Sequence, residues 1–197
     1  MFTVDTPFHA YSLESYDPAS GSVGRLTSED LKGRWVVLFF YPADFTFICP
    51  TELADLNTVH PEFRKLKAEI VAVSTDTVYT HKAWLDTEAL LAGVNYVMAA
   101  DHNGRLSKEL GIYDEEKGMA QRAAFIIDPE GVLRVADVVS DPIGRNAQEL
   151  LRRLKALQHV RAHPGNVCPL SWEQTGTLKP SIAKAGKVAR EFKRRAK

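Results

Sequence analysis

The sequence predicts an α/β layered fold, and three observations support that prediction. Short apolar runs rich in β-branched and aromatic residues alternate with segments whose apolar residues recur at helical spacing. Clusters of turn-forming residues separate these segments. The chain has 197 residues, of which 45% are hydrophobic and 25% are charged, so it is long enough for one well-buried domain and an extension.

The expected strands are continuous apolar runs, which are typical of strands buried on both faces of a sheet. They cover residues 35–41, 70–75, 96–100, 123–127 and 132–135. The last two runs flank a short turn that contains Pro and Gly, and this pattern predicts an antiparallel hairpin. We expect the residues up to about Ser22 to form a short hairpin or an irregular entry.

The expected helices cover about residues 50–66, 78–91, 106–110 and 145–160, and a brief one is expected between Thr27 and Gly33. Pro61 should break or kink the first helix, because proline has no N–H and crowds the preceding turn. A second helical piece should then continue through Leu66.

Cys49 lies where the first buried strand ends and the first long helix begins. Pro42 ends the strand, whereas Pro50 is well tolerated in the first turn of a helix. An ordinary cysteine is only about 3% thiolate at neutral pH, and ionising half of it requires roughly 2 kcal/mol. A helix N-terminus supplies about 0.3–1 kcal/mol, so a reactive thiolate here also needs a cationic side chain. The alternative is a small buried hydrophobe, which is common for free cysteines.

The residues around Cys49 resemble the peroxidatic signature of the peroxiredoxins. From Phe40 to Glu52 they read Phe-Tyr-Pro-x-Asp-Phe-Thr-Phe-x-Cys-Pro-Thr-Glu. The match is to the typical two-cysteine branch, which includes the C subunits of bacterial alkyl hydroperoxide reductases. From His163 to Pro169, the segment His-Pro-Gly-x-Val-Cys-Pro resembles the resolving-cysteine arm of the same branch.

The resemblance covers nearly the whole chain and narrows the expected fold. It implies a thioredoxin-like central mixed sheet flanked by helices, with a C-terminal extension. Residues 1–162 would form the peroxidase domain. Residues 163–197 would form an arm that carries the resolving cysteine and a basic helical tail.

The same resemblance implies the roles of individual residues. Cys49 is the nucleophile that attacks the hydroperoxide substrate and becomes a sulfenic acid. Thr46 and Arg122 hold the two peroxide oxygens, and Pro42 shields the site from water. No metal or organic cofactor is required.

Two further residues are expected to support this site. Glu52 resembles the acid that braces the active-site arginines of the family, and Arg145 resembles a second arginine of the same network. Without the resemblance, these residues and Arg122 would be interpreted as ordinary surface charges.

Cys168 is the expected resolving cysteine. In typical family members that thiol belongs to the partner subunit, so the resemblance implies an intersubunit disulfide between Cys49 and Cys168. It also implies homodimers that assemble into decamers. The reductant of the disulfide would be a thioredoxin-like protein or a flavoprotein disulfide reductase.

Composition sets limits on other partners. The 25 basic and 25 acidic residues give a formal net charge of zero, so no overall field recruits nucleic acid or a membrane surface. Seven basic residues follow Pro180, but one short cluster is more typical of a solvated helix than of a nucleic-acid site. No targeting or membrane-spanning segment is recognisable, so we expect a cytoplasmic protein.

The sequence leaves three other functions to consider. An oligomeric holdase chaperone is the alternative, and it could coexist with the peroxidase. A metal site formed by His159, His163 and Cys168 is disfavoured because Pro164 follows directly and no acidic ligand stands beside them. A disulfide oxidoreductase of the thioredoxin kind requires Cys-x-x-Cys, which the sequence lacks.

Overall fold

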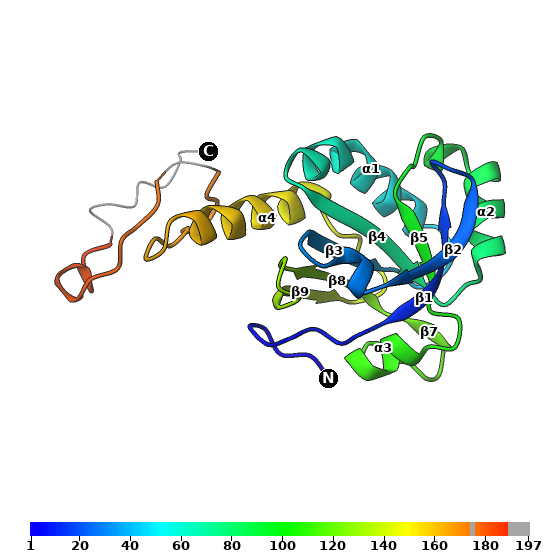
Figure 1. Ribbon diagram of the computed structural model, residues 1–197, viewed down its shortest axis with the longest axis horizontal. Helices are drawn as coiled ribbons and strands as arrows, with labels where there is room; N and C mark the ends of the chain where they lie inside the picture. Colours follow the sequence, from blue (N-terminus) through cyan, green and yellow to red (C-terminus); the bar gives the residue numbers. More distant parts are fainter. Residues whose placement is uncertain (174–175, 189–197) are drawn as a thin grey trace. The chain divides into compact units, whose positions relative to one another are not determined.

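A seven-stranded sheet with the strand order β2-β1-β5-β4-β3-β8-β9 carries the fold (Figure 1). The computed structural model describes residues 1–173 and 176–188. Strands β3, β4 and β5 are mutually parallel, and the other pairings are antiparallel. The predicted α/β class with a mixed central sheet is therefore confirmed. The strands are β1 (Ser12–Asp17), β2 (Ser22–Thr27), β3 (Trp35–Phe40), β4 (Ala68–Ser74), β5 (Val97–Ala100), β8 (Arg122–Ile127) and β9 (Leu133–Val139).

The helices lie close to the positions predicted from hydrophobic spacing. They are α1 (Cys49–Lys65), α2 (Val78–Thr87), α3 (Arg105–Leu110) and α4 (Ala147–Ala162), with single 3₁₀ turns η1 (Glu29–Leu31), η2 (Ala89–Leu91) and η3 (Ile182–Lys184). A small hairpin of β6 (Tyr113–Asp114) and β7 (Met119–Ala120) was not predicted, because two-residue strands are too short to show a periodicity.

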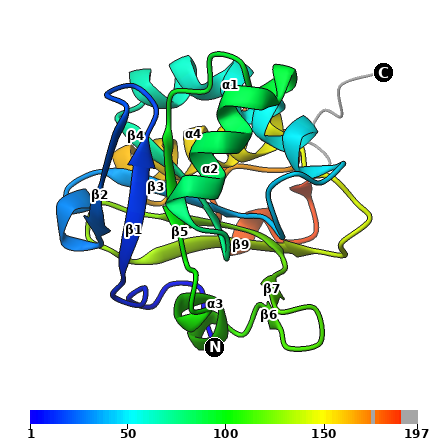
Figure 2. The same cartoon turned by 90° about the vertical axis from the view of Figure 1, so that its right-hand side faces the viewer.

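Strand β3 is buried along its whole length because both faces of the sheet are covered. Val36, Leu38 and Phe40 point to a cluster that includes Leu106 and Leu110 of α3. Figures 1 and 2 show α1 on the other side of the sheet from α3. Residues 41–48 connect the carboxyl end of β3 to the N-terminus of α1. This β3–α1 loop therefore lies at the carboxyl end of the buried strand.

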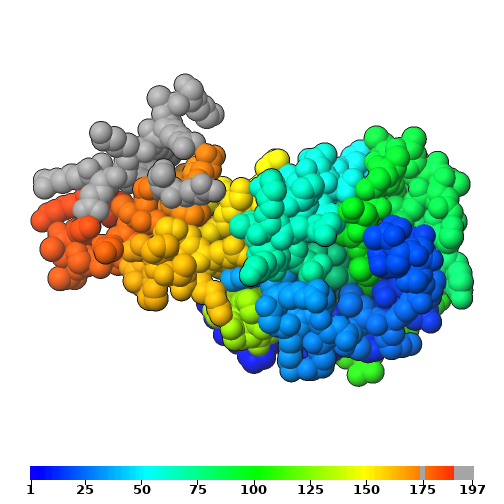
Figure 3. All heavy atoms as spheres, turned by 45° about the horizontal axis from the view of Figure 1, so that its top comes forward, coloured from blue at the N-terminus to red at the C-terminus, as the bar shows by residue number. Residues whose placement is uncertain are grey.

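The N-terminal hairpin pairs β1 with β2, and Ser12 lies opposite Thr27. Strand β2 is an edge strand whose residues are mostly exposed. The space-filling view shows this hairpin, coloured blue, at the surface (Figure 3). Of the two alternatives expected for this region, the hairpin is the one that forms, and it continues past Ser22.

Of the predicted break or kink at Pro61, the break is wrong, because α1 continues through Pro61 to Lys65 as one helix. Pro61 itself is exposed, whereas Val59 and Phe63 on either side of it are buried. Burying a large apolar side chain contributes about 1.5–3 kcal/mol, and an interior proline costs about 3 kcal/mol. The packing of the neighbouring residues therefore offsets the hydrogen bond that Pro61 cannot donate.

The chain divides into two compact units, residues 1–148 and 149–197. In the second unit, α4 is followed by an arm in which Val167 and Leu178 form an isolated bridge. Residues 163–172 contain no helix or strand, as the turn-forming residues predict. Residues 189–197 of the predicted basic helical tail lie outside the described residues. The division into 1–162 and 163–197 stays a prediction.

The described helices were compared with the length and hydropathy of membrane-spanning helices. None of the helices within residues 1–173 and 176–188 combines the length and the hydropathy that crossing a bilayer requires.

Replacing Pro61 by Ala should raise the free energy of unfolding by up to about 3 kcal/mol, because alanine restores an N–H donor and is favoured in helices. Urea denaturation measures this change. Pro50→Ala is the matched control, since Pro50 lies in the first turn where no intrahelical bond is lost. A Pro61→Ala protein no more stable than the control variant would contradict this explanation.

Candidate active site

The loop between β3 and α1 carries the first group of predicted site residues. Pro42 follows the strand, Thr46 lies in the loop, and Cys49 is the first residue of α1. Cys49 is fully buried. The helix has no side-chain cap, because Ile48 occupies the N-cap position. The sulfur therefore lies at a helix N-terminus, as predicted from the sequence, and it is also buried inside the protein.

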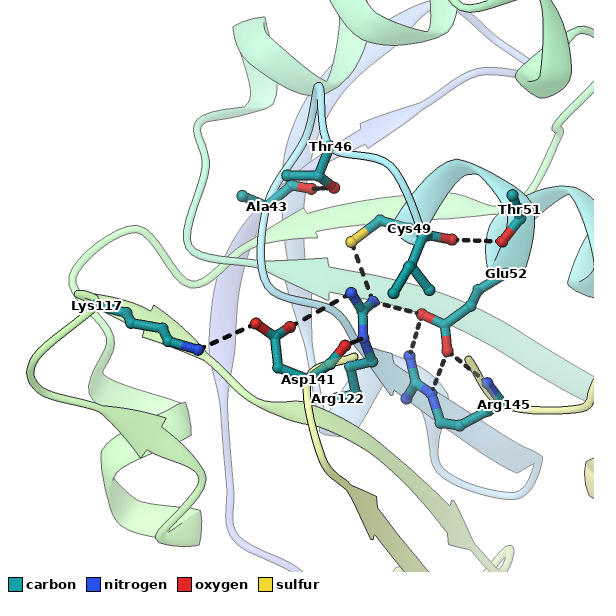
Figure 4. Close-up of polar contacts among 10 residues, drawn as sticks. Ala43, Thr46, Cys49, Thr51, Glu52, Lys117, Arg122, Asp141 and Arg145 are labelled. Carbon is teal, nitrogen blue, oxygen red and sulfur yellow. Dashed lines mark hydrogen bonds and ion pairs between the residues drawn. The ribbon is translucent and has the colours of Figure 1, made fainter. Parts of the chain in front are cut away.

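Arg122 supplies the cation that the sequence analysis required beside Cys49. It begins β8, and the pairing of Phe40 with Ala123 places it beside the carboxyl end of β3. Arg122 Nη1 donates to Cys49 Sγ over 3.2 Å and to a Glu52 carboxylate oxygen over 2.8 Å (Figure 4). Arg122 is only 3% exposed, so solvent screens these contacts little.

Glu52 holds two arginines at once. Its side chain lies one turn after Cys49 and is buried. Oε2 accepts from Arg122 Nη1, and Oε1 accepts from both the backbone N–H and Nε of Arg145, each over 2.8 Å. The Arg145 guanidinium also lies 3.6 Å from the centroid of the Phe39 ring. The carboxylate is thus saturated by donors, which a buried charge requires.

For each of the two arginines, burial lowers the pKa and the anionic neighbours raise it. Burial tends to lower the pKa of Arg122, but the Cys49 sulfur and Glu52 outweigh it and raise that pKa. For Arg145, burial outweighs Glu52 and lowers the pKa. Arginine stays protonated in proteins, so two cations and one carboxylate lie together beside the sulfur.

Asp141 completes the set of groups that hold Arg122, and the sequence analysis missed it. Its backbone oxygen accepts from Arg122 Nε over 2.6 Å, and its carboxylate lies 3.4 Å from Nη2. Lys117 pairs with the same carboxylate. The expected hairpin offered a signal: Arg122 pairs with Val139, so the residues just after the second strand lie beside Arg122.

Thr46 and Pro42 both lie in the β3–α1 loop, but their surroundings differ. Thr46 is half-buried and donates its hydroxyl hydrogen to the Ala43 carbonyl over 2.8 Å. Pro42 is buried and lines a cavity of about 370 Å³, whose other walls come from residues 114–121 and 138–141. In the view of Figure 4, the Cys49 sulfur is drawn between the Thr46 side chain and the Arg122 guanidinium.

Cys168 belongs to the second unit, so the structure does not group it with the residues above. Both cysteines are free thiols. The Cys168 thiol donates to the Ala156 carbonyl over 3.8 Å. Burial raises the pKa of Cys168, and the nearby Arg152 opposes that rise. Cys168 in this environment is therefore a thiol rather than a thiolate at neutral pH.

The histidines proposed as alternative metal ligands pack against each other instead. The His159 and His163 rings stack at 4.2 Å between centroids, and the Trp172 ring lies 4.7 Å from that of His159. Within residues 1–173 and 176–188, no three His, Cys, Asp or Glu side chains are grouped so that they could hold a metal ion.

Comparison with known proteins identifies the family of this chain. Residues 6–136 match the model of the AhpC/TSA family. Alkyl hydroperoxide reductase C of Escherichia coli K12 is 45% identical over 189 residues, covering 95% of this chain and all of that protein. The protein of the same name from Staphylococcus epidermidis is 42% identical over the same coverage.

Solved structures of similar proteins indicate the same family. The crystal structure of Enterococcus faecalis AhpC superposes with a TM-score of 0.81 at 41% identity, covering 86% of this chain and all of that one. Reduced 2-Cys peroxiredoxin of Plasmodium vivax superposes with a TM-score of 0.87 at 29% identity, covering 93% and 96% of the two chains. The thioredoxin-like fold and the peroxiredoxin assignment predicted from the sequence are confirmed: the chain belongs to the AhpC/TSA family.

Proposed function

We propose that this chain is a thiol-dependent peroxidase that reduces hydrogen peroxide and organic hydroperoxides at Cys49. The observation that carries the proposal is the buried sulfur 3.2 Å from a guanidinium that is itself held by Glu52 and Asp141. The names of the relatives, alkyl hydroperoxide reductase C and 2-Cys peroxiredoxin, support the same reaction.

In the first step, the Cys49 thiolate attacks the terminal oxygen of the hydroperoxide. A sulfur–oxygen bond forms and the oxygen–oxygen bond breaks, which gives a sulfenic acid and an alkoxide or hydroxide that takes up a proton. The barrier arises from negative charge on the leaving oxygen, so a donor placed at that oxygen accelerates the step. Arg122 is such a donor, because Glu52 and Asp141 fix its plane beside the sulfur.

Thr46 and Pro42 complete the proposed substrate site. Because Thr46 donates to Ala43, its oxygen keeps lone pairs that can accept a hydrogen bond from the hydroperoxide O–H. Pro42 is buried and offers no N–H donor to water, which agrees with a shielding role. The substrate is thus oriented by one acceptor and one donor, with its terminal oxygen toward the sulfur.

In the second step, Cys168 of the partner subunit attacks the sulfenic acid, forming a disulfide and releasing water. Bridged cysteines require Cα atoms within about 7 Å, so the buried Cys49 must leave its position at the start of α1. We infer that the first turn of α1 unwinds and that the arm around Cys168 rearranges with it. A thioredoxin-like or flavoprotein disulfide reductase then restores both thiols, and homodimers that assemble into decamers are the proposed oligomeric form.

Stoichiometric peroxide should produce a covalent dimer on non-reducing electrophoresis. The band should be absent in Cys49→Ser, which cannot form the sulfenic acid, and in Cys168→Ser, which cannot resolve it. A dimer band that persists in either variant would contradict the pairing. The holdase alternative is separated in the same variants, because client protection should survive in Cys49→Ser while peroxide consumption stops.

Arg122→Lys should lower kcat/KM for hydrogen peroxide by about 10²- to 10³-fold, since lysine keeps the charge but loses the planar set of donors. Stopped-flow fluorescence of the tryptophans measures the second-order rate. The matched control is Arg134→Lys, because Arg134 pairs with Asp5 and Asp128 and not with Cys49. Equal rates in the two variants would remove Arg122 from the mechanism.

Disulfide formation should accelerate as pH rises from 7 to 9, because burial raises the pKa of Cys168 and only its thiolate attacks. Arg152→Ala removes a cation that opposes this rise, so it should slow the step further. Arg153→Ala is the control, since Arg153 binds the same Glu149 as Arg152 does. Rapid mixing with peroxide, followed by alkylation, measures the rate, and an unchanged rate in Arg152→Ala would contradict the assignment.

A further inference from the structure

The proposed chemistry leaves one buried ionisable pair unused. Asp44 and His81 have fully buried side chains, and their Oδ2 and Nδ1 atoms lie 2.8 Å apart. The other ring nitrogen, His81 Nε2, faces the Ala99 carbonyl at 3.3 Å. Each ring nitrogen of His81 therefore faces an oxygen atom, so the ring is held at both ends. Asp44 also accepts from the Tyr41 hydroxyl over 2.7 Å.

The backbone of Asp44 is fixed as firmly as its side chain. Its N–H donates to the Asp76 carboxylate over 2.8 Å, and the Ser74 hydroxyl donates to the same Asp76 oxygen over 2.8 Å. Burial raises the pKa of Asp44, and the hydrogen bond and charge of His81 oppose that rise. His81 therefore stabilises the ionised form of Asp44. Residue 44 is therefore tied to the end of β4, to α2 and, through His81, to β5.

The hydrogen bonds that fix Asp44 do not extend to the next residue, Phe45. Phe45 has a positive φ of 54°, is 56% exposed, and packs its ring 6.1 Å from that of Trp84. The Thr46 side-chain hydroxyl donates only to Ala43 within the same loop, and Phe47 is 94% exposed. Ile48 provides no side-chain cap for α1. Downstream, Arg122 donates to the buried Cys49 sulfur over 3.2 Å, and the two arginines hold Glu52.

We propose that the Asp44–His81 pair is a positioning clamp that fixes the upstream end of the catalytic segment, residues 45–51. The clamp holds Thr46 in register with Cys49 during the peroxide step and confines the later unwinding to the residues between Asp44 and Glu52. This inference rests on the proposed function, because it concerns the same two steps. It predicts that loosening the clamp slows the first step and speeds the second.

His81→Leu removes both ring nitrogens and keeps the bulk of the side chain, and His81→Asn restores a donor near the Nδ1 position. We expect His81→Leu to react about 10- to 100-fold more slowly with peroxide, the loss typical of a small misplacement of a reacting group. Its disulfide should form several-fold faster once the sulfenic acid is present. Amide hydrogen exchange over residues 45–51 should rise, and His81→Asn should recover most of each change.

Asp101→Asn is the matched control for a merely structural effect. Asp101 is also a buried aspartate, and it accepts from the backbone of Leu106 and Ser107 at the start of α3. Its substitution should lower Tm while leaving the ratio of the two rates and the exchange of residues 45–51 unchanged. Where His81→Leu does not fold, Asp44→Asn provides the same comparison.

The clamp is overturned if His81→Leu lowers Tm as Asp101→Asn does but keeps the wild-type ratio of rates and the wild-type exchange. That result leaves the proposed function intact, since the wild-type enzyme still consumes peroxide. Failure of the wild-type enzyme to consume peroxide overturns the proposed function instead. Hydrogen exchange then decides the clamp alone: faster exchange of residues 45–51 in His81→Leu supports it, and unchanged exchange overturns it.

Discussion

One buried carboxylate organises the candidate active site. Glu52 binds Arg122 and Arg145 together, and without it two guanidiniums of like charge would be forced apart inside the protein. With it, a cation stays 3.2 Å from the Cys49 sulfur. A unit charge at about 4 Å contributes several times the energy of a helix dipole, at the effective dielectric constant typical of proteins. The helix N-terminus alone is therefore a minor part of the electrostatics.

The sheet decides which residues Glu52 can bring together. The antiparallel register of β3 and β8 sets Arg122 beside the exit of β3, and that of β8 and β9 brings Asp141 to the other side of its guanidinium. A slip of one residue would turn Arg122 to the opposite face of the sheet. The buried apolar strands that hold this register therefore also position the charged residues.

Rigidity and mobility meet within a few residues of the chain. The loop before Cys49 is fixed at Asp44, and α1 is fixed at Glu52, but residues 45–48 between them have two exposed rings and no side-chain helix cap. Proposed peroxide reduction needs an ordered site, and proposed resolution needs Cys49 to leave it. A short weak segment between two strong anchors satisfies both demands, because unwinding it leaves the core of the sheet intact.

Local sequence patterns were enough to predict the elements around Cys49. Apolar runs predicted β3, β4, β5 and β8, and the position of Cys49 at a helix start followed from Pro42 and Pro50. A continuous signature of thirteen residues, from Phe40 to Glu52, predicted the family. Contacts between distant residues were decided only in the tertiary structure. Asp141 holds Arg122 across a hairpin, and His81 lies 37 residues from Asp44. Pro61 stays helical because the packing of its neighbours outweighs its local preference, and no local pattern records that balance.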